Sequence, residues 1–125
     1  MSPSADDLVV RARRRIRRIE PGDLAGALAA GSLVVDIRPA AQRAVEGALP
    51  GAIVVERNVL EWRLDPNGSH RLAQVTNLDR PVVVVCSEGY ASSLAAESLH
   101  DLGYHAAGDL VGGYRAWSAW RDQRD

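Results

Sequence analysis

Four consecutive valines and the cysteine that follows them constrain the fold of this chain more than any other feature. The run Val82–Val85 predicts a strand that is buried on both faces, as the strands of a parallel sheet are. Cys86, the only cysteine, comes at its end; from Leu94 the apolar spacing becomes that of a helix, which Gly103 ends. A tight loop thus joins the carboxyl end of a strand to a helix N-terminus, where open α/β sheets bind their ligands.

The loop after Cys86 suits a reactive thiol. Backbone N–H groups can point into such a loop, and the dipole of the following helix adds positive potential, so a thiolate forms more readily there. The alternative is that the cysteine is a small buried hydrophobe. A core cysteine needs neither Gly89 nor the pair Ser92 and Ser93, which we expect to cap the helix. Cys86 is therefore the predicted nucleophile.

Strand and helix patterns alternate along the chain, which predicts an α/β fold with a parallel sheet and helices on both of its faces. The expected strands cover residues 17–19, 33–37, 52–55, 82–85 and 106–110. The expected helices begin after Pro21, at Ala40, after an N-cap at Asn58, beyond the cysteine loop and near Tyr114. We expect residues 1–18 to be an N-terminal tail, loose over 1–10 and Arg-rich from 11, and residues 19–125 to be a single domain.

Composition and charge fit a small cytoplasmic domain. A net charge of −1 argues against a general nucleic-acid or membrane-surface binder. A single cysteine cannot form an internal disulfide, so no oxidising compartment is implied. No run is long and apolar enough to cross a bilayer, and the N-terminus lacks a signal-peptide pattern. We expect a cytoplasmic protein without nucleic-acid or membrane partners.

The segment Arg11–Arg18 is the one local anomaly of charge, with six arginines in eight residues. Such a run can bind an acidic protein or RNA. The alternative is a solvated segment balanced by acids elsewhere, which the near-zero total charge favours. Nothing beside it supplies stacking aromatics or a nucleic-acid-binding fold.

Four motifs follow one another along the chain: Leu33–Arg38, a strand pattern ending in Asp-x-Arg; Glu46–Ala52, which holds Pro50 and Gly51; Cys86–Ser93, the cysteine loop; and Asp109–Trp117, which contains Leu-x-Gly-Gly-x-x-x-Trp. In the same order they resemble the motifs of the rhodanese-like family of sulfurtransferase-type domains, from about Ile19 to Arg121. The second is similar to that family's Gly-His-Ile-Pro-Gly-Ala, with Ala48 in place of the usual His, and the third to its active-site loop. Any one of these is a weak signal, whereas four in order are specific. The resemblance implies the rhodanese-like three-layer sandwich, with five parallel strands.

Sulfane-sulfur transfer is the chemistry that this resemblance implies. Cys86 would take sulfur from a small-molecule or protein donor, hold it as a persulfide and pass it to a thiol or other nucleophilic acceptor, which splits one transfer into two steps. A protein partner is one form that donor or acceptor can take. The resemblance calls for no metal and no organic cofactor.

The same resemblance places the substrate-binding residues in the loop after the cysteine: Ser87, Glu88, Gly89, Tyr90, Ala91 and Ser92. Many family members carry cations at the positions of Ser87 and Ala91, which attract an anionic donor such as thiosulfate. Both are neutral here, and the acid Glu88 lies between them. An acid near an incoming anion costs on the order of 1 kcal/mol in partly solvated surroundings. We therefore expect weak use of thiosulfate.

Residues outside the loop complete the predicted site. Arg57, just past the third strand, is expected beside the loop to compensate for the acid, and Arg63 is a second candidate; the alternative for both is a surface arginine. Asp36 and Arg38 are expected to support the neighbouring loops as an ion pair or hydrogen-bond network. Tyr90 is expected to be exposed at the loop tip, as part of an acceptor or partner surface.

Two other functional classes fit parts of the pattern. Cysteine-dependent phosphatases and arsenate reductases also place a cysteine loop before a helix, but they need an arginine at the sixth position after the cysteine to clamp an oxyanion. That position holds Ser92, which argues against them. The second alternative is a non-catalytic rhodanese-like interaction or redox-sensing module. Donor, acceptor, pathway and oligomeric state are left open by the sequence.

Overall fold

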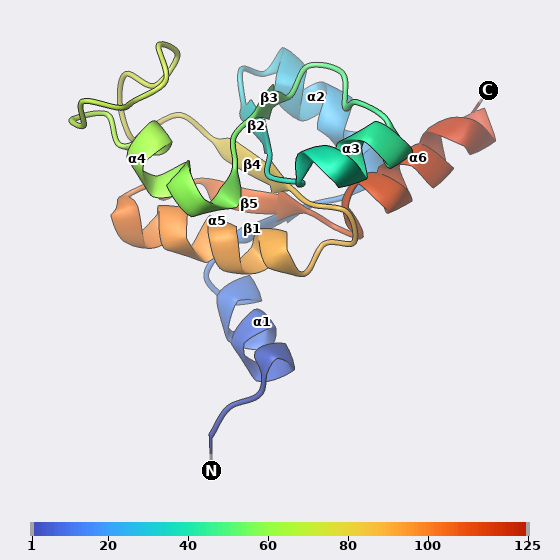
Figure 1. Ribbon diagram of the computed structural model, residues 1–125, viewed down its shortest axis with the longest axis horizontal. Coiled ribbons are helices and arrows are strands. Elements are labelled where there is room, and N and C mark those ends of the chain that lie inside the picture. Colours follow the sequence, from blue (N-terminus) through green and yellow to red (C-terminus); the bar gives the residue numbers. More distant parts are fainter. Residues whose placement is uncertain (1, 125) are drawn as a thin grey trace.

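The four-valine run forms the centre of a parallel sheet. In the computed structural model, which describes residues 2–124, the strand order is β1-β5-β4-β2-β3 and every neighbouring pair runs parallel (Figure 1). The strands are β1 (Arg17–Ile19), β2 (Leu33–Asp36), β3 (Ile53–Val54), β4 (Val82–Val85) and β5 (Ala107–Leu110). The predicted α/β class and the five-stranded parallel sheet are confirmed.

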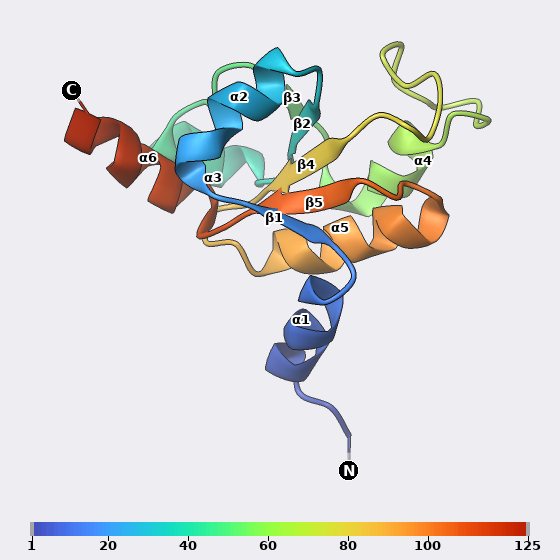
Figure 2. The same cartoon turned by 180° about the vertical axis from the view of Figure 1, so that it is seen from behind.

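Helices cover both faces of this sheet, which completes the predicted three-layer sandwich. They are α1 (Ala5–Arg13), α2 (Leu24–Ala29), α3 (Ala40–Glu46), α4 (Leu60–Leu64), α5 (Ala91–Leu102) and α6 (Gly113–Arg124). In Figures 1 and 2, α4 and α5 lie on one side of the sheet, and α2 and α6 lie on the other. None of the helices in residues 2–124 is long and apolar enough to span a membrane.

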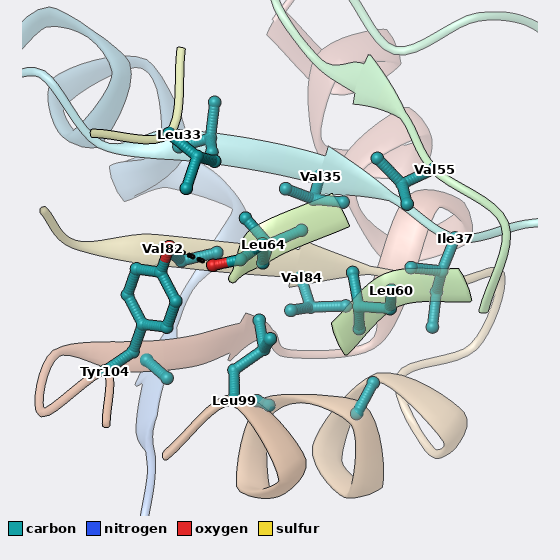
Figure 3. Packing of buried hydrophobic residues seen from close by; sticks show 14 of the residues in the cluster. Leu33, Val35, Ile37, Val55, Leu60, Leu64, Val82, Val84, Leu99 and Tyr104 are labelled. Atoms are coloured by element: carbon teal, nitrogen blue, oxygen red, sulfur yellow. Dashed lines mark hydrogen bonds between the residues drawn. The ribbon is translucent and has the colours of Figure 1, made fainter. Parts of the chain in front are cut away.

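Side chains alternate between the two faces of each strand, so the sheet contributes to two hydrophobic cores, one on each face. On the face of α4 and α5, alternate strand residues such as Val35 and Val84 pack against Leu60 and Leu99 (Figure 3). On the opposite face, the intervening valines pack against α2 and against Tyr114 of α6. Both faces of β4 are therefore buried, as the unbroken valine run predicts.

The core on the α4 side also fixes the end of α4. The Tyr104 hydroxyl donates a hydrogen bond of 2.6 Å to the carbonyl oxygen of Leu64 (Figure 3). Burial of the ring and this hydrogen bond satisfy both the apolar and the polar part of the side chain. The end of α4 is thereby tied to the chain that leads into β5.

The expectation of a loose segment over residues 1–10 is wrong for residues 5–10, which belong to α1; residue 1 lies outside the described residues. Ser4 and Asp7 form a reciprocal capping box that starts α1, and Val9 and Ala12 are buried. The helix packs against the outer side of α5 (Figure 1). Only these two positions of α1 are buried, so its sequence, which also holds two aspartates and two arginines, shows only a narrow apolar stripe. The division of the chain at residue 19 stays a prediction.

The predicted N-cap at Asn58 is also wrong. Residues Arg57–Val59 form a 3₁₀ turn that leads directly into α4, so Asn58 lies inside the turn and makes no side-chain cap hydrogen bond to this helix. The tighter turn carries the chain from β3 into the helix without a capping side chain. Its own hydrogen bonds run from the Val59 N–H to the Glu56 carbonyl oxygen and from the Leu60 N–H to that of Arg57.

Candidate active site

The cysteine loop holds the thiol of Cys86 against two backbone N–H groups. Gly89 N–H donates to Sγ at 3.1 Å and Ser92 N–H donates at 3.3 Å. Cys86 follows β4 directly, and α5 begins at Ala91, so the sulfur lies between the end of a strand and the start of a twelve-residue helix. Both N–H donors and the helix dipole favour negative charge on the sulfur.

The N-terminus of α6 fixes the direction of the loop's first carbonyl groups. Tyr114 N–H donates to the Cys86 carbonyl oxygen at 2.8 Å, and Arg115 N–H donates to that of Ser87 at 3.0 Å. The close approach of α6 to the loop requires glycine at position 113, because its φ is +68° and an added Cβ would lie 2.5 Å from the Cys86 carbonyl oxygen. With these carbonyls bound to α6, the later N–H groups of the loop remain available to the sulfur.

The start of α5 is anchored through a buried carboxylate rather than by capping hydroxyls. The hydroxyls of Ser92 and Ser93 donate to Asp109 at 2.8 Å and 2.7 Å, and Arg18 of β1 pairs with the same carboxylate at 3.0 Å. The expectation that the serine pair caps α5 is wrong: Tyr90 is the N-cap residue, and it makes no side-chain cap hydrogen bond. Both serines instead tie the helix to β5.

A pocket of about 470 Å³ opens beside the thiol. Its lining brings together Cys86 and five of the residues that the sequence analysis assigns to substrate binding: Ser87, Glu88, Tyr90, Ala91 and Arg57. Gly89 and Ser92 do not line the pocket, but the N–H group of each donates to the sulfur. Tyr90 is 56% exposed, at the loop tip as expected. Arg63 instead donates to the His70 carbonyl oxygen and does not line this pocket.

The charge at the pocket depends on two residues that the sequence analysis missed. Arg115 of α6 pairs with Glu88 at 3.0 Å and with Glu46 of α3 at 2.9 Å. Glu46 also accepts a hydrogen bond from the Ser87 hydroxyl at 3.0 Å. Although burial raises the pKa of Glu46, hydrogen bonds from Arg115, Arg38 and Ser87 outweigh it and hold that pKa below its ordinary value.

Asp36 and Arg38 form a buried ion pair under the same loop. Arg38 donates to both carboxylate oxygens of Asp36, with the shortest distance 2.7 Å, and reaches Glu46 at 3.1 Å. Its guanidinium also lies 4.0 Å from the centroid of the Tyr114 ring. This arrangement links β2, α3 and α6 beneath the cysteine loop, where the sequence analysis expects such a network.

Arg57 lines the pocket but is itself paired. Its guanidinium contacts Glu61 of α4 at 3.0 Å, one helical turn along the chain. Both side chains are partly exposed, so an incoming anion can compete for the guanidinium. Within residues 2–124, no cluster of three or more His, Cys, Asp or Glu side chains is placed to hold a metal ion.

The chain is similar to known proteins in both sequence and fold. The family sequence model of the rhodanese-like domain matches residues 20–119 of this chain. The thiosulfate sulfurtransferase GlpE of Shewanella oneidensis is 41% identical over 51 residues, which cover 41% of this chain and half the length of that relative. Among solved structures, a human single-domain sulfurtransferase is 25% identical with a TM-score of 0.68, over 82% of this chain and 95% of that chain.

A second solved structure is similar over almost the whole chain. It is a Rhodopseudomonas palustris protein of unknown function, described as a possible tyrosine phosphatase, with 25% identity and a TM-score of 0.86 over 97% of this chain and 93% of that one. Its similarity extends the comparison to nearly the full length described here. Since the family match covers residues 20–119, which include all four motifs, the chain belongs to the family of rhodanese-like domains.

Proposed function

We propose that this protein is a sulfurtransferase that carries a sulfane sulfur as a persulfide on Cys86. The observation that carries the proposal is the setting of Cys86: its Sγ accepts hydrogen bonds from two backbone N–H groups, and the residue lines an open pocket. The thiolate carries its charge on Sγ, so donors that are already oriented toward that atom stabilise the attacking nucleophile and also the thiolate that forms again when the sulfur leaves. The similarity to a thiosulfate sulfurtransferase and to a human single-domain sulfurtransferase supports the same reaction class.

The reaction proceeds in two displacement steps on sulfur. In the first, the Cys86 thiolate attacks the outer sulfur of the donor, the donor S–S bond breaks, and the donor leaves with the electron pair; thiosulfate would release sulfite. In the second, an acceptor thiolate attacks the outer sulfur of the persulfide. The bond between that sulfur and Sγ breaks, and its electron pair returns to Cys86. The thiolate is restored, with no external oxidant or reductant.

The pocket residues take the roles that their positions allow. Ser87, Ala91 and Arg57 line the space in which the donor would lie, and Tyr90 stands exposed at its mouth, where an acceptor thiol would approach. Glu88 places an acid on the same lining, although Arg115 partly neutralises it. We propose a donor less negatively charged than thiosulfate, such as a small or protein-borne persulfide, and a cytoplasmic location, where thiols stay reduced.

A phosphatase function is disfavoured by the position of one side chain. Phosphatases with a cysteine loop clamp the phosphate with an arginine at the sixth position after the cysteine. Here Ser92 occupies that position, and its hydroxyl is buried and donates to Asp109 rather than into the pocket. We predict that the protein does not hydrolyse an aryl phosphate such as p-nitrophenyl phosphate above the rate of Cys86→Ser. Cysteine-dependent hydrolysis would contradict the proposal.

Steady-state sulfur transfer separates the enzyme from a non-catalytic or redox-sensing module. The assay follows transfer from a persulfide donor to a thiol acceptor, with sulfur-transfer product measured against time. Wild type is expected to turn over many times, and Cys86→Ser is expected to lose activity to the uncatalysed background, since its hydroxyl cannot form a persulfide. Retained activity in the serine variant would refute the assignment. A wild type that never turns over would favour the interaction module.

A further inference from the structure

The N-terminal helix reaches the cysteine loop from outside the matched family region. The family match begins at residue 20, whereas α1 covers Ala5–Arg13. Figures 1 and 2 both show α1 beyond α5, on the side away from the sheet. It packs against α5, which begins at the cysteine loop, and its residues Val9 and Ala12 are buried. Arg13, the last residue of α1, is thereby brought to the loop.

The Arg13 side chain makes three contacts there. Nη2 donates to the carbonyl oxygen of Gly89 at 2.8 Å, and Nε donates to the Ser93 hydroxyl at 3.1 Å. The guanidinium carbon lies 5.6 Å from the centroid of the Tyr90 ring, within the range of a cation–π contact. The planar guanidinium thus contacts both the loop tip and the first turn of α5, which a single-point donor could not do in the same geometry.

The contact with Gly89 is the important one. The Ser93 hydroxyl has a single proton, and its 2.7 Å contact with Asp109 is much shorter than its 3.3 Å contact with the Gly89 carbonyl. Arg13 is therefore the closer donor to that buried carbonyl. A charged donor at 2.8 Å makes one of the stronger hydrogen bonds of the loop.

Fixing this carbonyl orients the peptide groups around the sulfur. The carbonyl of Gly89 and the N–H of Tyr90 belong to one planar trans peptide unit and point in opposite directions. The N–H of the same glycine belongs to the preceding unit and donates to Cys86 Sγ. Gly89 has a φ of +88°, a conformation that glycine adopts without strain but does not prefer, so external contacts decide which conformation dominates.

Further ion pairs hold the segment that carries Arg13. Arg15 pairs with Glu97 and Asp101 on α5, and Arg18 pairs with the buried Asp109. Half of the six arginines in the segment Arg11–Arg18 are thus engaged within the fold. The position of Arg13 is consequently set by α1 packing on one side and by these ion pairs on the other.

We propose that Arg13 is a positioning residue that holds the cysteine loop in the conformation required for sulfur transfer. It acts through the Gly89 carbonyl and does not touch the sulfur. The proposal rests on the proposed persulfide function of Cys86. It also gives the N-terminal helix a role in the site, beyond the region that the family match covers.

Three variants test it: Arg13→Ala, Arg13→Lys and, as matched control, Arg14→Ala, which removes the same charge from the exposed neighbouring residue. We expect Arg13→Ala to lower kcat for sulfur transfer by roughly tenfold, since the N–H donors at the sulfur are misplaced rather than lost. KM for the donor should stay within about twofold, because Arg13 does not itself line the pocket. The lysine variant should recover part of kcat, because its ammonium can reach only one acceptor at a time.

Amide hydrogen exchange supplies a readout that does not need activity. Exchange at the Gly89 and Ser92 N–H groups, which donate to Sγ, should become faster in Arg13→Ala. Exchange in β4 of that variant, and at all of these amides in the Arg14→Ala control, should match wild type. Unchanged exchange at these two amides overturns the proposal, whether or not the protein transfers sulfur. Unchanged kcat in an active protein overturns it as well. If wild type lacks transferase activity but the exchange changes as expected, the positioning stands and only the proposed function fails.

Discussion

At the scale of residues, the charge around the pocket is set by pairs rather than by single side chains. Glu88 is paired with Arg115, and Arg57 with Glu61, and all four groups are at least partly exposed. Exposed pairs of this kind are worth about 0.2–1 kcal/mol, so a ligand can break them. An approaching anion therefore meets guanidinium groups that are available at small cost, with Glu88 opposing it.

Removing Arg57 should weaken the use of an anionic donor. We expect Arg57→Ala to lower kcat/KM for thiosulfate by roughly threefold to tenfold at low ionic strength, and by less at about 0.5 M salt, where charges are screened over a few ångströms. Arg63→Ala is the matched control, because Arg63 contacts the His70 carbonyl outside the pocket. Equal losses in the two variants would show that the effect is one of general charge, not of position.

Neutralising Glu88 should act in the opposite direction. Glu88→Gln removes the acid from the pocket lining, and we expect thiosulfate kcat/KM to rise by about twofold to threefold at low salt, since one exposed charge contributes under ~1 kcal/mol. The rise is limited because Arg115 already offsets part of that charge. Kinetics that match wild type at every ionic strength would mean that Glu88 does not influence the donor.

At the scale of elements, the periodic segments were predictable and the contacts between them were not. The valine run and the helical spacing after it place Cys86 correctly, because both signals lie within a few residues of it. Arg115 joins Glu88 across 27 positions and Arg13 joins Gly89 across 76, and no spacing rule connects such pairs. The capping box of Ser4 and Asp7 was the one readable signal for α1, but an arginine-rich helix with a narrow buried stripe resembles a solvated tail.

The junction between the cysteine loop and α6 should tolerate no side chain at Gly113. We expect Gly113→Ala to lower the free energy of unfolding by about 3 kcal/mol, the sum of left-handed backbone strain and a clash with the Cys86 carbonyl. Gly26→Ala is the control, since Gly26 lies in α2 with no described atom within 4 Å of an added Cβ. That variant should gain up to about 1 kcal/mol. Urea denaturation measures both, and equal effects would contradict the assigned geometry.

On the scale of the whole molecule, Glu46 joins three segments that meet at the site. It contacts Arg38 beyond β2, Ser87 in the cysteine loop and Arg115 on α6. Its pKa is held below the ordinary value in the folded protein. An acid with a lowered folded-state pKa stabilises the fold above its unfolded value of about 4.3, and this stabilisation is lost as the pH falls through the folded value.

Acid should therefore destabilise wild type more than Glu46→Gln. We expect the variant to be less stable at about pH 7, and to lose less free energy of unfolding than wild type between about pH 5 and pH 3. Denaturant titrations at both ends of this range measure the difference, with the exposed Glu20→Gln as control for the charge change. A wild-type loss no larger than that of Glu46→Gln would show that these contacts contribute nothing to stability.

Intact mass spectrometry tests the central claim most directly, because it detects sulfur on the protein itself. After exposure to a persulfide donor and removal of excess reagent, wild type should gain the mass of one sulfur atom and lose it on addition of a thiol reductant. Cys86→Ser, treated in the same way, should gain nothing. A wild type that stays unmodified, or a serine variant that gains the same mass, would contradict the assignment of Cys86 as the sulfur carrier.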